Sequence, residues 1–305
     1  MGRFAPTPSG YMHAGNILCA LIAYLSVKRK GGKFIVRIED LDAQRCAASR
    51  ARDILNVLDE LGLKSDEPPV FQSERAEAYK AAERVLSERA SLYPCFCTRA
   101  ELHAAEAPRL SDGGVAYSGT CKRLTNEQRT RLLDIRKPCT RIEVPDETIT
   151  FTDGLCGEYS QNLARDCGDF IIKRSDGVYA YQLAVVTDDG AIGVTEIVRG
   201  ADLLSSTPRQ IYLQRLLGLP TPQYCHIPLV CDAHGRKLSK SEGDGAERLL
   251  NEFDAHTVLG GLAYAAGIIT SFRPASLDEL IEAFDFDNVK RDAIFLPEQF
   301  DLNKR

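Results

Sequence analysis

Two segments far apart in the chain carry side chains that suit a polyphosphate. The first, 3–16, starts like a strand, is broken by two prolines and a glycine, and brings His13 and Asn16 to the start of an apolar helix pattern. Free N–H groups at a helix start favour anions. The second segment, 235–241, is a loop that carries Lys237, Lys240 and two serines. Cations there would hold phosphates from the opposite side, so the two segments together predict an ATP site.

Size and composition limit the class of protein. A chain of 305 residues that is 44% hydrophobic can bury roughly 75% of its unfolded surface, which is enough for one large or two modest domains. The net charge of -5 excludes a uniformly basic nucleic-acid surface but leaves room for local phosphate contacts. The sequence shows no signal-peptide core and no run of about eighteen apolar residues, which predicts a cytoplasmic protein without a membrane span.

The elements that must position the phosphate segments alternate between helix and strand patterns, which predicts an α/β sheet. After the proline turn, 17–30 is typical of a helix and 33–39 of a buried strand. Ligands of open parallel sheets bind beyond the carboxyl ends of the strands, where both the His13 turn and Glu39 would lie. Further predicted elements are helices 49–62, 73–91 and 207–217, β-structure near 148–151, a hairpin formed by 169–173 and 178–183, strands 193–200 and 227–230, and a mainly helical remainder after 241.

The motifs, taken as an ordered set, resemble a known family. Segments 3–16, 34–42, 179–189, 199–202 and 237–241 are similar to those of class I glutamyl-tRNA synthetases. Two features favour the short subfamily, the glutamyl-queuosine tRNA(Asp) synthetases. The chain stops at residue 305, which leaves no room for an anticodon-binding region, and its cysteines resemble that subfamily's zinc site.

The resemblance implies a class I synthetase fold. This is a Rossmann-like parallel sheet with an inserted zinc-bearing subdomain and a C-terminal helical region. The expected parts are a first catalytic half 1–92, a tRNA-contacting insertion 93–176, a second catalytic half 177–241 that ends in the lysine loop, and helices 242–305.

The resemblance also implies roles for individual residues. Glutamate has two carboxylates and one ammonium, which call for two cations and one acid. The implied glutamate site comprises Arg3, Ala5, Thr7, Glu39, Tyr181 and Arg199, the implied ATP site His13, Asn16, Asp202 and Lys240, and the implied catalytic groups His13, Asn16, Lys237 and Lys240. Each residue has a structural alternative. Arg3 could be a strand-edge charge, Tyr181 a core residue, and Arg199 an ion-pair partner of Glu196.

Asn16 departs from the family pattern, which has a second histidine at this position. An amide still donates a hydrogen bond but cannot become a cation. Activity is therefore expected to persist, while the strength of ATP binding is left open.

Four residues of the insertion resemble the subfamily's zinc ligands. Cys95, Cys97, Tyr117 and Cys121 would offer three thiolates and one phenolate to a single structural Zn2+ ion. The alternative is a pair of ordinary buried cysteines with an unrelated third, because structural zinc sites usually present two short cysteine pairs.

The implied activity has two steps. ATP with Mg2+ activates L-glutamate, and the glutamyl group then moves to queuosine at the wobble position of tRNA(Asp), whose anticodon arm the insertion would hold. Basic candidates for phosphate contact are Arg123, Arg129, Arg131, Arg136 and Lys137, although a solvated helix face explains them equally well. A monomer is expected. Two other functions stay open, namely a shortened synthetase that charges tRNA(Glu) and a non-catalytic paralogue that binds glutamate or tRNA.

Overall fold

The computed structural model describes residues 1–104, 117–232, 235, 238 and 246–300. At its centre lies a five-stranded parallel sheet in the order β10-β9-β1-β2-β3. Buried parallel strands require apolar side chains on both faces, and β2 is buried along its whole length. The strands are β1 (Gly2–Phe4), β2 (Phe34–Ile38), β3 (Val70–Phe71), β9 (Glu196–Gly200) and β10 (Gln223–Ile227).

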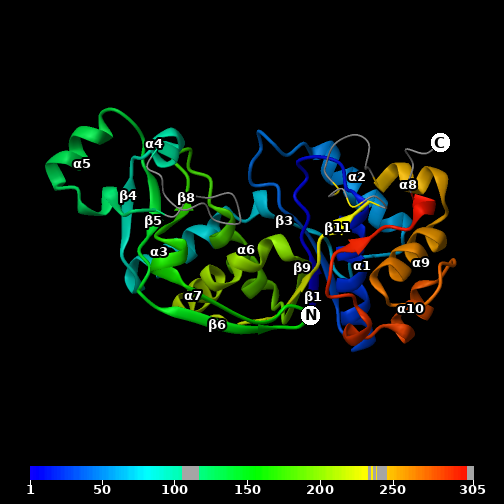
Figure 1. Cartoon of the computed structure of the whole chain (residues 1–305). Helices are drawn as coiled ribbons and strands as arrows, with labels where there is room; N and C mark the ends of the chain where they lie inside the picture. Colours follow the sequence, from blue (N-terminus) through cyan, green and yellow to red (C-terminus); the bar gives the residue numbers. More distant parts are fainter. Residues whose placement is uncertain (105–116, 233–234, 236–237, 239–245, 301–305) are drawn as a thin grey trace.

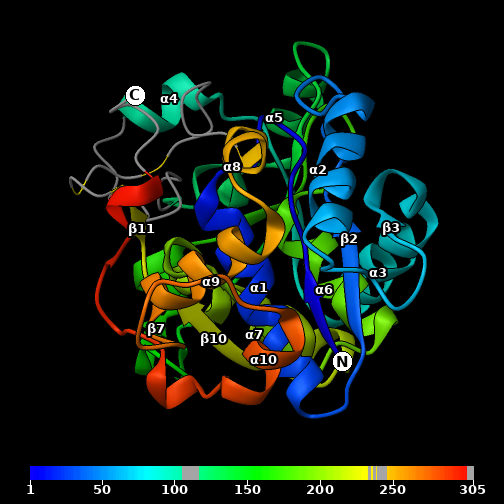
Figure 2. The ribbon, with the colours of Figure 1, turned by 90° about the vertical axis from the view of Figure 1, so that its right-hand side faces the viewer.

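Helices cover both faces of this sheet (Figure 1). The helix α1 packs on β1, β2 and β9, and α9 and α10 cover it from outside (Figure 2). Because α1 is enclosed on all sides, its sequence is apolar around the whole helix. The helices on this face are α1 (Ala14–Arg29), α2 (Ala48–Glu60), α8 (Ala246–Glu252), α9 (Ala255–Ala266) and α10 (Leu277–Ala283). The helices on the other face are α3 (Ala76–Arg89), α6 (Tyr181–Ile192) and α7 (Thr207–Leu217).

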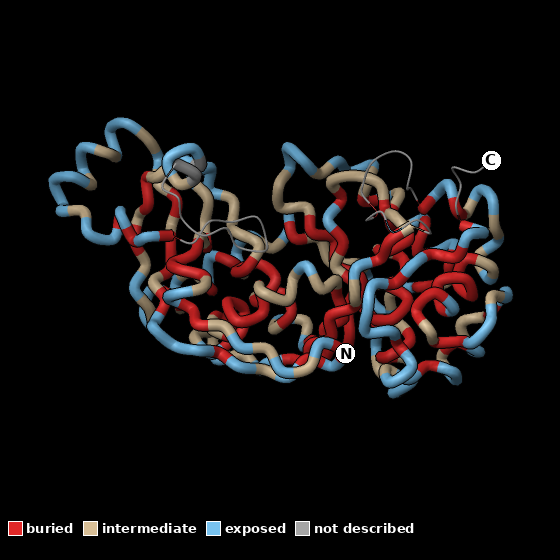
Figure 3. The backbone as a smooth tube through the Cα atoms, in the orientation of Figure 1, coloured by how far each residue is buried: buried red, intermediate tan, exposed pale blue. Residues whose placement is uncertain are grey.

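The segment between α3 and α6 extends away from the central sheet (Figure 1). Its outer part is a three-stranded antiparallel sheet, β4-β5-β8, with a small core of its own. Helix α5 has no buried residue and is exposed in Figure 3. The elements are β4 (Leu92–Cys95), α4 (Arg99–Ala104), α5 (Asn126–Leu133), β5 (Cys139–Ile142) and β8 (Phe170–Lys173).

A long hairpin leads from this outer sheet back to the central sheet. It consists of β6 (Thr148–Asp153) and β7 (Gly157–Asn162), and β6 packs against β10 and α7. The backbone N–H of Gly154 donates to the carbonyl of Tyr224 at 2.9 Å. The hairpin therefore belongs to segment 93–176 in sequence but touches the central sheet in space.

Most predicted elements are present, and two predictions are wrong. The second strand of the hairpin predicted at 178–183 is a single bridge at Tyr179, because α6 begins at Tyr181 and buries its β-branched residues against α7. The strand predicted at 227–230 is two strands. Pro228 lacks the N–H needed to continue a ladder, so β10 ends at Ile227 and β11 (Val230–Cys231) pairs instead with β12 (Ile294–Phe295). Across the described residues, every helix is too short or too polar to span a membrane.

Candidate active site

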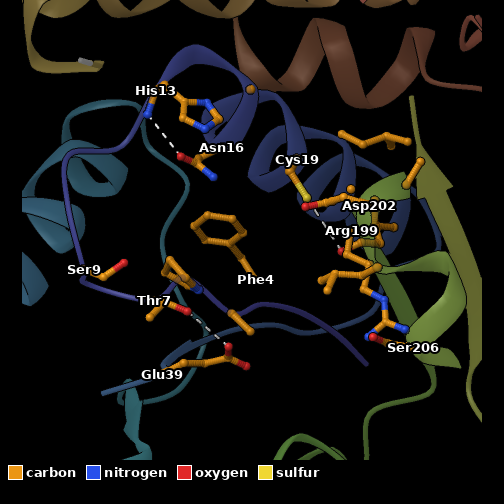
Figure 4. A pocket seen from close by; sticks show the side chains of 18 of the residues that line it. Phe4, Thr7, Ser9, His13, Asn16, Cys19, Glu39, Arg199, Asp202 and Ser206 are labelled. Carbon is orange, nitrogen blue, oxygen red and sulfur yellow. Dashed lines mark hydrogen bonds between the residues drawn. The ribbon is translucent and has the colours of Figure 1, made fainter. Parts of the chain in front are cut away.

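A cavity of about 790 Å³ opens beyond the carboxyl ends of β1, β2 and β9. Its wall is built by the turn that follows β1, the start of α1, the end of β2, the start of α6 and the end of β9. Lys237 and Lys240 lie outside the described residues. The other nine predicted glutamate and ATP residues all line the cavity: Arg3, Ala5, Thr7, His13, Asn16, Glu39, Tyr181, Arg199 and Asp202. Figure 4 labels six of them, Thr7, His13, Asn16, Glu39, Arg199 and Asp202.

A buried charge network lies beneath the part of this cavity that holds Arg3 and Glu39. Arg37 is fully buried and forms ion pairs with Asp189 and, at 3.2 Å, with Glu39. Nε of Arg3 donates to Asp189 at 3.3 Å, so Arg3 is not a strand-edge charge. Burial opposes ionisation of Asp189, but the guanidinium groups of Arg37 and Arg3 outweigh it and lower the pKa of this carboxyl. Asp189 therefore holds the side chain of Arg3, and Arg37 holds the side chain of Glu39.

Sequence reasoning missed Arg37 and Asp189. The available signal was a charged residue inside the apolar run of β2, where alternation turns Arg37 toward the opposite face from Val36 and Ile38. Its buried partner on α6 could not be identified from the sequence, because the two residues are 152 positions apart.

Glu39 ends β2 and is the acidic group of the cavity. Its Oε2 accepts a hydrogen bond of 3.5 Å from Oγ1 of Thr7 (Figure 4), and its Oε1 accepts from Nη2 of Arg37. Burial raises the pKa of Glu39 despite the nearby arginines. Such a carboxylate gains from a cation that enters the cavity, which is what the ammonium group of an amino acid supplies.

Arg199, on β9, is held along one edge of its guanidinium by two side chains. Its Nε donates to Nε2 of His226 at 2.9 Å, and its Nη2 donates to Oγ1 of Thr207 at 2.8 Å. Nη1 is buried and has no hydrogen-bond partner among the residues that the structure describes. The alternative pairing with Glu196 is wrong, since Glu196 instead binds Lys30 and Ser26.

Tyr181 is the first residue of α6, and its side chain is half-buried in the cavity wall. Burial raises the pKa of its phenol, so the hydroxyl stays protonated and can donate a hydrogen bond. Tyr181 also packs at the edge of the core between the sheet and α7, so the core alternative is partly correct.

The start of α1 forms the side of the cavity where the phosphate contacts are predicted. Oδ1 of Asn16 accepts from the backbone N–H of His13 at 3.1 Å (Figure 4). Because a backbone N–H can only donate, the amide oxygen must face it, and the NH₂ group is left to donate elsewhere. Asp202 lies across the cavity in the 3-10 turn that follows β9.

The four predicted metal ligands meet at the end of β4, beside the outer sheet. The sulfurs of Cys95, Cys97 and Cys121 lie within 4.8 Å of one another, and the pair from Cys97 and Cys121 is 3.5 Å apart. The hydroxyl of Tyr117 is 3.7 Å from the sulfur of Cys97. Tetrahedral zinc with Zn–S bonds of about 2.3 Å separates its sulfurs by about 3.8 Å, so these side chains fit a zinc ion.

All five basic residues predicted to contact phosphate lie on or beside α5: Arg123, Arg129, Arg131, Arg136 and Lys137. Arg136 contacts Glu101 and the carbonyl of Phe96, which ties it to the outer sheet. Leu133 and Ile135 on the same stretch are exposed.

Comparisons with known proteins agree with this geometry. Residues 1–257 match the family described as tRNA synthetases class I (E and Q), catalytic domain. The chain is 44% identical to a glutamyl-Q tRNA(Asp) synthetase from Symbiobacterium thermophilum, over 97% of this chain and 95% of that one. It is 43% identical to the protein of the same name from Neisseria gonorrhoeae, over 97% and 99%.

Among solved structures, a glutamate-tRNA synthetase from Elizabethkingia anophelis superposes with a TM-score of 0.84 at 26% identity, over 97% of this chain and 68% of that one. The family expected from the motifs is thus confirmed. The chain belongs to the class I tRNA synthetases of the glutamate and glutamine type and, within them, to the glutamyl-Q tRNA(Asp) synthetases.

Proposed function

We propose that this protein activates L-glutamate with ATP and transfers the glutamyl group to queuosine at the wobble position of tRNA(Asp). The observation that carries the proposal is the set of charges around one cavity. Arg3 and Arg199 face it as cations and Glu39 as an acid, which matches the two carboxylates and the ammonium of glutamate. Nη1 of Arg199, which is buried and has no hydrogen-bond partner among the described residues, is the donor left for a substrate carboxylate.

In the activation step, the α-carboxylate of glutamate attacks the α-phosphorus of ATP and pyrophosphate leaves. This requires an anionic nucleophile beside an anionic polyphosphate, so donors must be aimed at the phosphates before the reaction. His13 and the NH₂ group of Asn16, at the start of α1, supply such donors, and Asp202 accepts a ribose hydroxyl. Lys237 and Lys240 would bind the departing pyrophosphate, and Mg2+ bound with ATP would share that charge.

In the transfer step, a hydroxyl of the cyclopentene-diol of queuosine attacks the activated carbonyl and AMP leaves. The anticodon arm must then reach the cavity while the outer sheet holds it. The basic residues on and beside α5 support this role, since that helix is exposed along its length. One Zn2+ ion held by Cys95, Cys97, Tyr117 and Cys121 would stabilise the outer sheet, a role supported by the distances between these ligands.

The test is transfer of labelled glutamate, with ATP, to three RNAs side by side: queuosine-containing tRNA(Asp), unmodified tRNA(Asp) and tRNA(Glu). Nuclease digestion then locates the label in the anticodon fragment or at the 3′-terminal adenosine. Label in the anticodon fragment of queuosine-containing tRNA(Asp) alone is expected. Label at the 3′ end of tRNA(Glu) would identify a shortened charging synthetase, and label on none of them, with glutamate still bound, would identify a binding protein.

A further inference from the structure

Behind Arg199 lies a buried pair that the reaction does not use directly. Asp153 is the last residue of β6, and His226 lies on β10; both side chains are 0% exposed. Oδ2 of Asp153 is 2.6 Å from Nδ1 of His226. Removing an ionisable pair from water costs free energy, which only good geometry and additional hydrogen bonds can offset.

The hydrogen bonds of Asp153 fix the protonation of His226. Oδ1 of Asp153 accepts the backbone N–H groups of Leu155, Cys156 and His226, each at 3.0 Å. Oδ2 is left for the imidazole, so Nδ1 carries a proton and donates it to Oδ2. Burial, helped by the nearby charge of Arg199, lowers the pKa of His226 and keeps the ring neutral. Its Nε2 therefore presents a lone pair.

That lone pair faces Arg199. Nε of Arg199 donates to it at 2.9 Å, and Nη2 donates along the same edge of the guanidinium to Oγ1 of Thr207, which lies 3.4 Å from Nε2 of His226. Two fixed bonds on a planar guanidinium set the direction of its remaining nitrogen, the buried Nη1 that has no partner in the described part of the chain. A chain of contacts thus runs from hairpin β6–β7 to the cavity wall.

We propose that Asp153 and His226 are positioning residues that orient Arg199, so that hairpin β6–β7 sets the affinity of the cavity for the substrate carboxylate. The inference rests on the proposed function, because it takes glutamate as the ligand of Arg199. It assigns to the hairpin a part in amino-acid recognition in addition to its place in the insertion.

The decisive variant is Asp153→Asn. The amide oxygen can keep the three backbone N–H bonds, but its NH₂ group then faces Nδ1 of His226. Nδ1 of His226 must then accept a hydrogen bond from this NH₂ group, so the proton of the ring moves to Nε2. The N–H at Nε2 would face the N–H of Arg199 Nε, and the hydrogen bond between His226 and Arg199 would be lost. We expect the KM for glutamate, and its Kd by calorimetry, to rise roughly 10- to 100-fold, the effect of one lost charge-assisted hydrogen bond. The KM for ATP should change less than about twofold on the same argument.

A pair of substitutions at His226 separates positioning from packing. The amide oxygen of His226→Gln reaches the place of Nε2 and can accept from Arg199. The shorter His226→Asn reaches only the place of Nδ1, so it keeps Asp153 and loses Arg199. Both variants remove the ring. The Gln variant should bind glutamate more tightly than the Asn variant, whereas a purely structural histidine would make them alike.

Tyr224→Phe is the matched control. Tyr224 stacks on His226, with an angle of 11° between the rings, and its hydroxyl accepts from Gln214 in the core. The variant is expected to lower thermal stability and to leave glutamate affinity unchanged. Circular dichroism must show all four variants folded at the assay temperature.

The outcomes for the two proposals are distinct. Unchanged glutamate affinity in Asp153→Asn, or equal rises in the KM for glutamate and for ATP, would overturn the positioning role and leave the proposed function intact. A wild-type protein that binds glutamate but transfers it to no tRNA would overturn the proposed function and not the positioning role. A wild-type protein that binds no glutamate would overturn both.

Discussion

Glu39 is a carboxylate whose ionisation burial opposes even though Arg37 lies beside it. Burial raises its pKa, so on acidification it takes up a proton at a higher pH than an exposed glutamate does. A proton on Glu39 competes with the ammonium of the substrate. We therefore expect the KM for glutamate to rise as the pH falls through the raised pKa of Glu39, while the KM for ATP stays level; pyrophosphate exchange across pH measures both.

Glu39→Gln is the control for this pH dependence. The amide cannot ionise, so the acid rise in the KM for glutamate should disappear. The KM should instead be high at every pH, by roughly 10- to 100-fold, because a charge-assisted hydrogen bond is lost. A variant that kept the pH dependence of the wild type would remove Glu39 from the ammonium site.

For Arg199, the planar shape of the guanidinium is expected to matter as well as its charge. Lysine in its place keeps one positive charge but loses the planar fork that binds His226 and Thr207 together. Arg199→Lys should raise the KM for glutamate at least 10-fold, and Arg199→Ala should abolish glutamate-dependent exchange with the fold intact. Exchange that survived unchanged in the alanine variant would show that Arg199 does not bind the substrate.

Among the elements, α1 combines two roles at one end. Its first turn ties Asn16 to the backbone of His13 and also faces the cavity. Asn16→Ala should lose the cap, at about 1 kcal/mol of stability, together with the donor to phosphate. Asn16→Asp keeps an acceptor for the cap and adds a charge that a helix start favours, but that charge repels phosphate.

The two Asn16 variants should therefore change stability and ATP binding independently. Denaturant unfolding is expected to show the alanine variant weakened and the aspartate variant close to wild type. The KM for ATP should be higher in the aspartate variant than in the alanine variant. The opposite order would mean that the amide of Asn16 does not face the phosphates.

In the whole molecule, the small core of the outer sheet is separate from the two cores that flank the central sheet. Its members include the three clustered cysteines and Tyr117. Strands β5 and β8 also bury Ile142, Phe170 and Ile172 in the core beside α6 and α7. If the cysteines and Tyr117 hold zinc, a chelator should therefore loosen the end of the outer sheet around them and leave the central sheet folded. We expect glutamate-dependent exchange to persist and transfer to tRNA to be lost, together with a new early transition on heating.

Cysteine variants check this prediction without a chelator. Cys121→Ser should purify with less than one zinc per chain and repeat the transfer defect. Cys156→Ser removes an exposed cysteine outside the cluster but keeps a donor for the carbonyl of His226, so it should retain both metal and transfer. Metal analysis by mass spectrometry gives the zinc content. Loss of exchange along with transfer in Cys121→Ser would show that the two parts of the molecule do not fold independently.

The sequence by itself determined the family, the parallel sheet and the line of residues around the cavity. These follow from local signals, because a strand that ends in acid and a proline turn before an apolar helix are contiguous in the chain. Chain order then brings the described members, from Arg3 to Asp202, to one edge of the sheet. The end of β1 followed from the proline that comes shortly after it, whereas the end of β10 at Ile227 was missed, since a strand was predicted over 227–230.

Only the tertiary structure decided what holds these residues in place. Arg37 meets Asp189 across 152 positions, and His226 meets Asp153 across 73. No periodicity or motif links such partners, because each pair forms only when the sheet, α6 and hairpin β6–β7 pack together. Burial then fixes their charge states, neutral for His226 and ionised for Asp189, since the cost of desolvation depends on every neighbour at once.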